Sequence, residues 1–173
     1  MSLDNHSPLC VGFPPSIDKN CTTLVLGSMP GVTSLEKQQY YAHPQNRFWP
    51  MMAMLLEGKQ EAPAAYEERL AMLLRHHVAL WDSIDSCVRE GSLDTSIRNA
   101  QGNDFSRLFH DYPKIHTICF NGAKSADCFR RFNRELWKHP GSRTFCAMPS
   151  TSPANARWRL PQLLEAWGKV IHP

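Results

Sequence analysis

Paired cysteines, phosphate-binding glycine loops and long hydrophobic runs are all missing from this sequence of 173 residues. Its six cysteines form no CxxC pair, and no cysteine–histidine spacing matches a zinc or iron–sulfur site. We therefore expect buried reduced thiols, no metal centre and no cofactor. The glycine spacing fits neither a Walker loop nor a dinucleotide fingerprint, which argues against phosphate-cradling nucleotide chemistry.

No apolar run reaches the roughly 18 residues of a membrane span. The first twenty residues lack the basic and apolar regions of a secretory signal. These absences favour a cytoplasmic location. We expect residues 1–20 to form a poorly ordered N-terminal segment, followed by a single α/β domain over residues 21–173.

The formal net charge of +3 is spread unevenly along the chain. Residues 121–160 contain eight Lys and Arg residues against only Asp127 and Glu135. A basic C-terminal quarter suits contact with a polyanion such as nucleic acid. A solvated basic helix face explains the same excess equally well, so charge alone does not identify a partner.

Short apolar runs alternate with stretches of helical periodicity. The runs expected to be buried strands cover residues 23–26, 78–81, 115–120 and 144–148. Between and after them, apolar residues recur at helical spacing, most clearly at Leu160, Leu163, Leu164 and Trp167. This alternation predicts a three-layer α/β/α sandwich around a central, mostly parallel, four-stranded sheet.

Small and polar residues follow each strand at the same end. The first strand leads into GSMPG, the second into WDSID, the third into FNGAKS and the fourth into MPSTSPANA. In parallel sheets, ligand sites gather at the carboxyl ends of the strands. We therefore expect these four segments to meet at one functional site.

Three of these segments resemble motifs of the uracil-DNA glycosylase superfamily. GSMPG is followed by Tyr-Ala-His-Pro-Gln-Asn-Arg-Phe-Trp at residues 41–49, which resembles the mismatch-specific branch and the related hypoxanthine-DNA glycosylases. Asn121-Gly122 and the Pro-Ser-rich stretch 149–155 resemble the other two motifs. The resemblance implies an enzyme that flips a base out of DNA and hydrolyses its N-glycosidic bond.

The resemblance also implies roles for individual residues. Tyr41 matches the position whose ring stacks on the extruded base, and Asn121 matches the position whose amide reads the base edge. The turn residues Gly27, Ser28 and Met29 are expected beside that base. An ordinary turn and an ordinary buried tyrosine are the alternative interpretations.

Met29 departs from members of the family that carry a water-activating Asn or Asp at this third turn position. Asn46, which the hypoxanthine branch keeps, then becomes the expected residue for positioning the water. Its alternative role is to cap the helix that begins near Pro50. His43 either donates to the leaving base or a phosphate, or fixes the loop. Asp82 is a solvated or loop-capping residue, a positioning residue or an alternative water activator.

The Pro-Ser-rich loop is expected to face the DNA. Proline and small residues make a stiff, slim wedge that can enter the gap left by a flipped nucleotide. The expected DNA-binding residues are Ser150, Ser152, Pro153, Ala154, Asn155 and Arg157.

We predict a monofunctional DNA glycosylase that acts on hypoxanthine first and uracil second, as a monomer. The uracil-specific branch has a histidine in its last motif loop, whereas residues 140–171 of this chain contain none. Only Lys37 occurs in the two principal motif segments, so a Schiff-base lyase is not indicated. The alternatives are a catalytically weak or inactive DNA-binding member of the same fold, and a hydrolase of free nucleosides.

Overall fold

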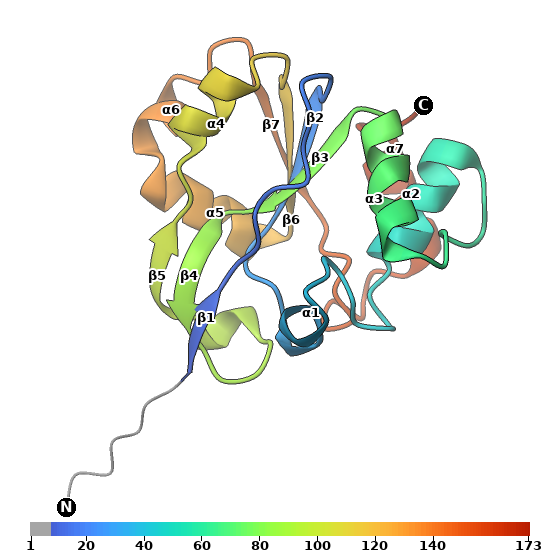
Figure 1. The fold of residues 1–173 in the computed structure, drawn as a ribbon, viewed down its shortest axis with the longest axis horizontal. Coiled ribbons are helices and arrows are strands. Elements are labelled where there is room, and N and C mark those ends of the chain that lie inside the picture. Colours follow the sequence, from blue (N-terminus) through green and yellow to red (C-terminus); the bar gives the residue numbers. More distant parts are fainter. Residues whose placement is uncertain (1–7) are drawn as a thin grey trace, which may run out of the picture.

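The computed structural model describes residues 8–173 and contains a central sheet of four parallel strands (Figure 1). These strands are β2 (Thr23–Gly27), β3 (Val78–Asp82), β6 (Thr117–Asn121) and β7 (Thr144–Met148), in the order β3-β2-β6-β7. All four strands were expected from the sequence. Three of them end one residue later than expected, and β6 begins two residues later.

Helices cover both faces of this sheet, which confirms the three-layer prediction (Figure 1). One layer contains α2 (Phe48–Glu57), α3 (Tyr66–Arg75) and α7 (Leu160–Gly168). The other contains α4 (Phe105–Asp111), α5 (Ala123–Phe132) and α6 (Arg134–Lys138). Alternate strand residues supply the two cores, because successive side chains of a strand point to opposite faces.

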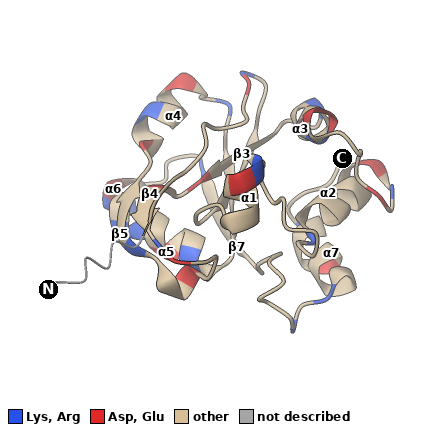
Figure 2. Cartoon of the chain, turned by 60° about the horizontal axis from the view of Figure 1, so that its bottom comes forward, with Lys and Arg blue, Asp and Glu red and all other residues tan. Residues whose placement is uncertain are grey.

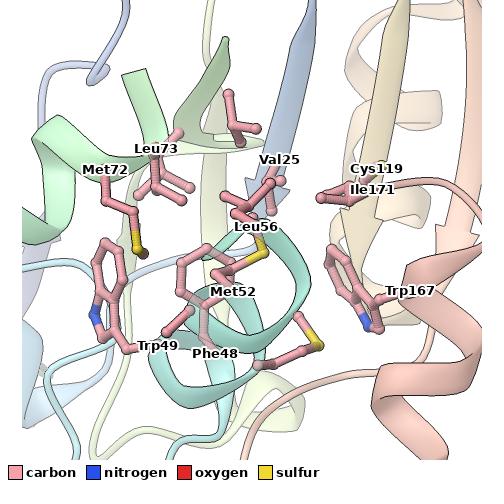
Figure 3. Packing of buried hydrophobic residues seen from close by; sticks show 14 of the residues in the cluster. Val25, Phe48, Trp49, Met52, Leu56, Met72, Leu73, Cys119, Trp167 and Ile171 are labelled. Carbon is pink, nitrogen blue, oxygen red and sulfur yellow. The ribbon is translucent and has the colours of Figure 1, made fainter. Parts of the chain in front are cut away.

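The larger core lies between the sheet and the layer that contains α2. Val25 and Cys119 of the sheet pack there with Phe48 and Met52 of α2 and with Trp167 of α7 (Figure 3). All five of these side chains are fully buried. This core fixes the start of α2, and with it the segment 41–47 that leads into the helix.

A second, antiparallel sheet was not expected from the sequence. It consists of β1 (Leu9–Val11), β4 (Ile84–Val88) and β5 (Arg98–Gly102), in the order β1-β4-β5. The sequence of β5, RNAQG, is mostly polar, and that of β4, IDSCV, sets two polar residues among three apolar ones. Neither strand therefore has the uninterrupted apolar signal of a buried strand.

The N-terminal segment differs from the expectation for residues 8–20. β1 pairs with β4, and Ser16 forms a bridge with Leu80 through hydrogen bonds of 3.0 and 2.9 Å. These backbone hydrogen bonds fix residues 8–20 against both sheets, so the expectation of poor order is wrong there. Residues 1–7 lie outside the described residues.

Three further observations concern the described residues. All six cysteines are free thiols, and five of them are buried. Across residues 8–173, no group of three or more His, Cys, Asp or Glu side chains could hold a metal ion. Within the same range, no helix has the length and apolar character needed to cross a membrane.

Candidate functional site

The carboxyl ends of the parallel strands bring Asp82, Gly27, Asn121 and Met148 into one row. Gly27 pairs with Asp82, Asn121 pairs with Met148, and the residues just before Gly27 and Asn121 pair with each other. Residues paired in parallel register point to the same face of a sheet. The row therefore faces the layer that contains α2.

A cavity of about 630 Å³ opens above this row. It is bordered by the GSMPG turn, by residues of segment 40–46, by loop 92–95 and by segment 148–155. Most of the predicted site residues line it: Gly27, Ser28, Met29, Tyr41, His43, Asn46, Asn121, Ser150, Ser152, Pro153, Ala154 and Asn155. Arg157 is exposed and lies outside this lining.

Tyr41 is held over Gly27 in an unusual backbone conformation. Its φ of 54° is in the left-handed region, which is uncommon for a bulky residue. The ring stacks on Phe48 with centroids 4.0 Å apart. A Cβ at Gly27 would lie 3.3 Å from the Tyr41 hydroxyl and 2.5 Å from Asp82 Oδ1. Glycine at position 27 therefore gives these two side chains the space above the strand end.

The neighbouring Tyr40 has a different place. Its side chain is buried in the core, and its hydroxyl donates to the carbonyl of Pro14 at 2.9 Å. Both tyrosines therefore border the cavity, but most of the Tyr40 side chain packs in the core.

Thr151 connects the two predicted amides. Asn121 Nδ2 donates to Thr151 Oγ1 at 3.0 Å, and the Thr151 amide donates back to Asn121 Oδ1 at 2.9 Å. The Thr151 hydroxyl in turn donates to Asn46 Oδ1 at 2.9 Å. Asn46 Oδ1 also accepts from the amide of Phe48 at 2.9 Å, at the start of α2. The Asn46 side chain therefore does stabilise the helix start, as its alternative role required.

No role was expected for Thr151, although it lies between two serines that were expected to bind DNA.

Arg47, for which no role was expected either, holds loop 149–155 in place. The Arg47 guanidinium donates to the carbonyls of Thr151, Ser152 and Asn155 at 3.2, 2.6 and 3.2 Å. A fork of several N–H donors is what arginine offers and lysine does not. The HPQNRFW run contained this residue, but one sequence shows no target for its guanidinium.

The Pro-Ser-rich loop also holds itself together. Asn155 Nδ2 donates to the carbonyl of Ser150 at 2.9 Å. The hydroxyls of Ser150 and Ser152 accept from backbone amides two residues further on, at 3.1 and 3.2 Å. Both hydroxyls keep their own proton for donation to another group.

The side chains of Met29 and Ser28 have different surroundings. The Met29 side chain is 94% buried and packs with Ile84 and Cys87 of the second sheet. The Ser28 hydroxyl donates to Asp94 Oδ1 at 2.6 Å. Met29 therefore borders the cavity while its thioether contributes to a separate apolar cluster.

His43 is exposed and fixes its own turn. Its Nδ1 accepts from the amide of Gln45 at 3.1 Å, and its carbonyl accepts from the amide of Asn46 at 2.9 Å. An accepting Nδ1 places the proton of a neutral imidazole on Nε2. The loop-fixing alternative accounts for these contacts.

Asp82 is the buried acid of the site. Only 4% of its surface is exposed, and its Oδ2 has no hydrogen-bond partner among the described residues. Burial is the main reason that the pKa of this carboxyl is raised to about 7; Arg89 acts against the rise, and Asp94 adds a smaller contribution to it. The Tyr41 hydroxyl has no hydrogen-bond partner within the geometric limits among residues 8–173; its pKa is raised by burial and by Asp82, and the nearby Asn121 amide opposes this rise. The structure therefore excludes a solvated or simple loop-capping Asp82.

The chain is similar in sequence to proteins of a known family. The family described as the uracil DNA glycosylase superfamily matches residues 14–170. A protein of Methanosarcina acetivorans named hypoxanthine DNA glycosylase is 39% identical over 147 residues, which cover 85% of this chain and 89% of the relative. A protein of the same name from Methanosarcina barkeri is 41% identical over 116 residues, covering 67% and 73%.

A solved structure shows the same fold. It is the solution NMR structure of a Methanosarcina acetivorans protein described as a candidate uracil DNA glycosylase. The two structures share a TM-score of 0.78 and 36% identity, over 94% of this chain and 96% of the other. The chain therefore belongs to the uracil DNA glycosylase superfamily.

Proposed function

We propose that this protein is a monofunctional DNA glycosylase that excises deaminated bases, hypoxanthine first and uracil second. By family membership the chain is a DNA glycosylase, a hydrolase that acts on N-glycosyl bonds. Among the described residues that line the cavity there is no lysine, which supports hydrolysis by water over a Schiff-base lyase.

The observation that carries the proposal is the pairing of an aromatic wall with an amide in one cavity. One face of the Tyr41 ring is stacked on Phe48, which leaves the opposite face for a base. Asn121 uses one proton and one lone pair of its amide on Thr151. Hypoxanthine and uracil both present an N–H beside a carbonyl, so either base can take over the lone pair and the proton that Asn121 now shares with Thr151.

Asn46 is the proposed residue for positioning the water. Both lone pairs of its Oδ1 are used, by Phe48 and Thr151, so the water takes the place of the Thr151 hydroxyl. The water oxygen bonds to C1′ of the sugar, and the proton that the water loses passes to the departing base. The C1′–N bond breaks, and its electron pair leaves with the base. Such an attack on an oxocarbenium-like carbon needs orientation more than a strong base.

Asp82 is the second candidate for activating that water, because its buried Oδ2 has no partner among the described residues. The two candidates differ in their pH dependence. An amide does not titrate, whereas a carboxylate base is lost as pH falls through its pKa. The ionisable groups that perturb Asp82 or are perturbed by it are Arg89, Asp94 and the hydroxyls of Tyr40, Tyr41 and Tyr66.

The order of bases rests on the loop and on the relatives. Segment 149–155 contains no histidine to stabilise a departing uracil anion. Hypoxanthine can instead leave with a proton on a ring nitrogen. Two relatives that match this chain over most of their own length are named hypoxanthine DNA glycosylases.

The proposed partner is DNA that contains a deaminated base, bound by a monomer in the cytoplasm. Loop 149–155 is the proposed wedge, with Ser150 and Ser152 donating to phosphates. Arg157, exposed beyond the cavity, is proposed to add a charge contact to the backbone.

The test uses labelled duplexes with one inosine or one uracil, followed by alkali to cleave abasic sites. We expect cleavage of the inosine strand, and slower cleavage of the uracil strand. Duplex binding that weakens steeply with salt, without cleavage, would instead identify an inactive DNA-binding member. Turnover of free deoxyinosine without DNA would identify a nucleoside hydrolase.

A further inference from the structure

Leu93 is an apolar residue at the rim of the cavity whose side chain is left in solvent. It lies between β4 and β5, borders the cavity and has 58% of its surface exposed. A single exposed leucine is ordinary on a protein surface. This one is different because both of its neighbours are tied down.

The two neighbours bind the GSMPG turn and the residue after it. Ser92 Oγ accepts from the amide of Val32 at 2.8 Å, and Asp94 Oδ1 accepts from the hydroxyl of Ser28 at 2.6 Å. The carbonyl of Leu93 itself accepts from the amide of Ser96 at 3.1 Å. The backbone is therefore fixed on both sides of an exposed leucine, beside the cavity proposed to receive the base.

The chemistry around Leu93 favours contact with bases over contact with phosphates. Glu90 and Asp94, close to it in the chain, are both exposed acids. Carboxylates repel the DNA backbone, so this loop has no charge with which to hold a phosphate. An apolar side chain can instead enter the base stack, as wedge residues of other DNA-bending proteins do.

Segment 149–155 of the loop after β7 lacks such a residue, and Trp158 further along that loop is exposed but does not line the cavity. Segment 149–155 also borders the cavity, but its sequence PSTSPAN offers only small or polar side chains besides proline. A flipped nucleotide leaves a gap in the base stack, and the base returns to the duplex unless another group fills this gap. A slim loop can enter the gap but gives little apolar surface to fill it.

We propose that Leu93 inserts into the base stack beside the flipped nucleotide and holds the duplex open, together with loop 149–155. The inference rests on the proposed function, because it assumes that a base is extruded into this cavity. Leu93 then matters only when the base must be taken out of a stacked, paired duplex.

The experiment compares Leu93→Ala with Leu93→Met and with Leu9→Ala. Leu9 is an exposed leucine of β1 that does not line the cavity, so it serves as the matched control. Each variant is given inosine in a paired duplex and the same inosine in an unpaired bubble. A 2-aminopurine next to the inosine reports unstacking by its fluorescence.

We expect Leu93→Ala to lower the single-turnover rate on the paired duplex about tenfold or more, and on the bubble less than about twofold. Leu93→Met and Leu9→Ala should behave as the wild type. Equal losses on both substrates, or no loss on either, would overturn the role of Leu93. If the wild type releases no base, the proposed function fails instead. The 2-aminopurine signal then decides: an unchanged signal in Leu93→Ala overturns the inference, and a lost signal supports it.

Discussion

Thr151 and Asn121 hold each other through two hydrogen bonds at the end of the sheet. The Asn121 amide donates to the Thr151 hydroxyl, and the Thr151 backbone amide donates to the Asn121 carbonyl oxygen. Both residues are at least 90% buried, so each bond is made away from bulk water. This pair fixes the orientation of the Asn121 amide at the cavity.

Replacing Thr151 with valine tests that pairing. Thr151→Val keeps the shape but removes the hydroxyl, so Asn121 Nδ2 and Asn46 Oδ1 each lose a partner. We expect a loss of about 1–2 kcal/mol in the free energy of unfolding. We also expect slower excision, because Asn121 can then rotate. Urea denaturation and single-turnover kinetics measure the two effects, with Thr144→Val as the control because Thr144 is exposed. Excision as fast as in the wild type would show that Thr151 does not position Asn121.

Asn46 has a structural bond and a proposed catalytic task, which can be separated. Asn46→Ala loses the bond to the Phe48 amide, and we expect it to lower stability by about 1 kcal/mol. Asn46→Ser can still accept from that amide through its hydroxyl, but has no amide group. We expect the serine variant to be nearly as stable as the wild type and still slow in excision. A fast serine variant would remove Asn46 from water positioning.

The buried carboxyl of Asp82 predicts how stability depends on pH. Its pKa is raised to about 7 in the folded protein, above the value of about 4 in the unfolded chain. The folded state therefore holds the proton more tightly between these values, and stability falls as pH rises from about 4 to 7. Asp82→Asn removes this loss.

We expect the stability of Asp82→Asn relative to the wild type to grow from pH 5 to pH 8, by an amount on the order of 2 kcal/mol. Denaturation at both pH values measures it, with Asp85→Asn as the exposed control. A difference that does not change with pH would show that Asp82 titrates normally. In the wild type, an excision rate that rises through pH 7 would favour Asp82 over Asn46 as the water activator.

Gly27 is predicted to tolerate no side chain. A Cβ there would meet Asp82 Oδ1 at 2.5 Å, so Gly27→Ala must displace the Asp82 carboxylate, and it would also press on the Tyr41 hydroxyl at 3.3 Å. We expect lower stability and at least a tenfold slower excision, because the base slot is narrowed. Gly168→Ala is the control, since its Cβ would meet only the end of the flexible Leu55 side chain at 3.2 Å. Normal excision by Gly27→Ala would place the base elsewhere.

The sequence predicted most of the central sheet because buried parallel strands carry an uninterrupted apolar signal. It did not predict β4, whose short sequence mixes apolar and polar residues, or β5, whose polar side chains are exposed on a small antiparallel sheet. Loop 92–95 remained without a role for the same reason, because its position depends on that sheet and on its bonds to Ser28 and Val32.

The hydrogen bonds between site residues were harder to predict from the sequence than which residues line the cavity. The motifs indicated Tyr41, Asn46 and Asn121, and all three line one cavity. The sequence does not indicate the role of Thr151, which joins two of them, because a threonine between two serines is typical of an ordinary loop. Asp82 lies at a strand end, but only the register with Gly27 shows that its carboxyl is buried.

The most direct measurement is a crystal structure of Asn46→Ser bound to a duplex with one inosine. We predict the hypoxanthine ring outside the helix, on the free face of Tyr41, with the Asn121 amide bonded to its edge. A base still stacked in the duplex, or one bound away from Tyr41 and Asn121, would contradict the assignment of this cavity as the base pocket.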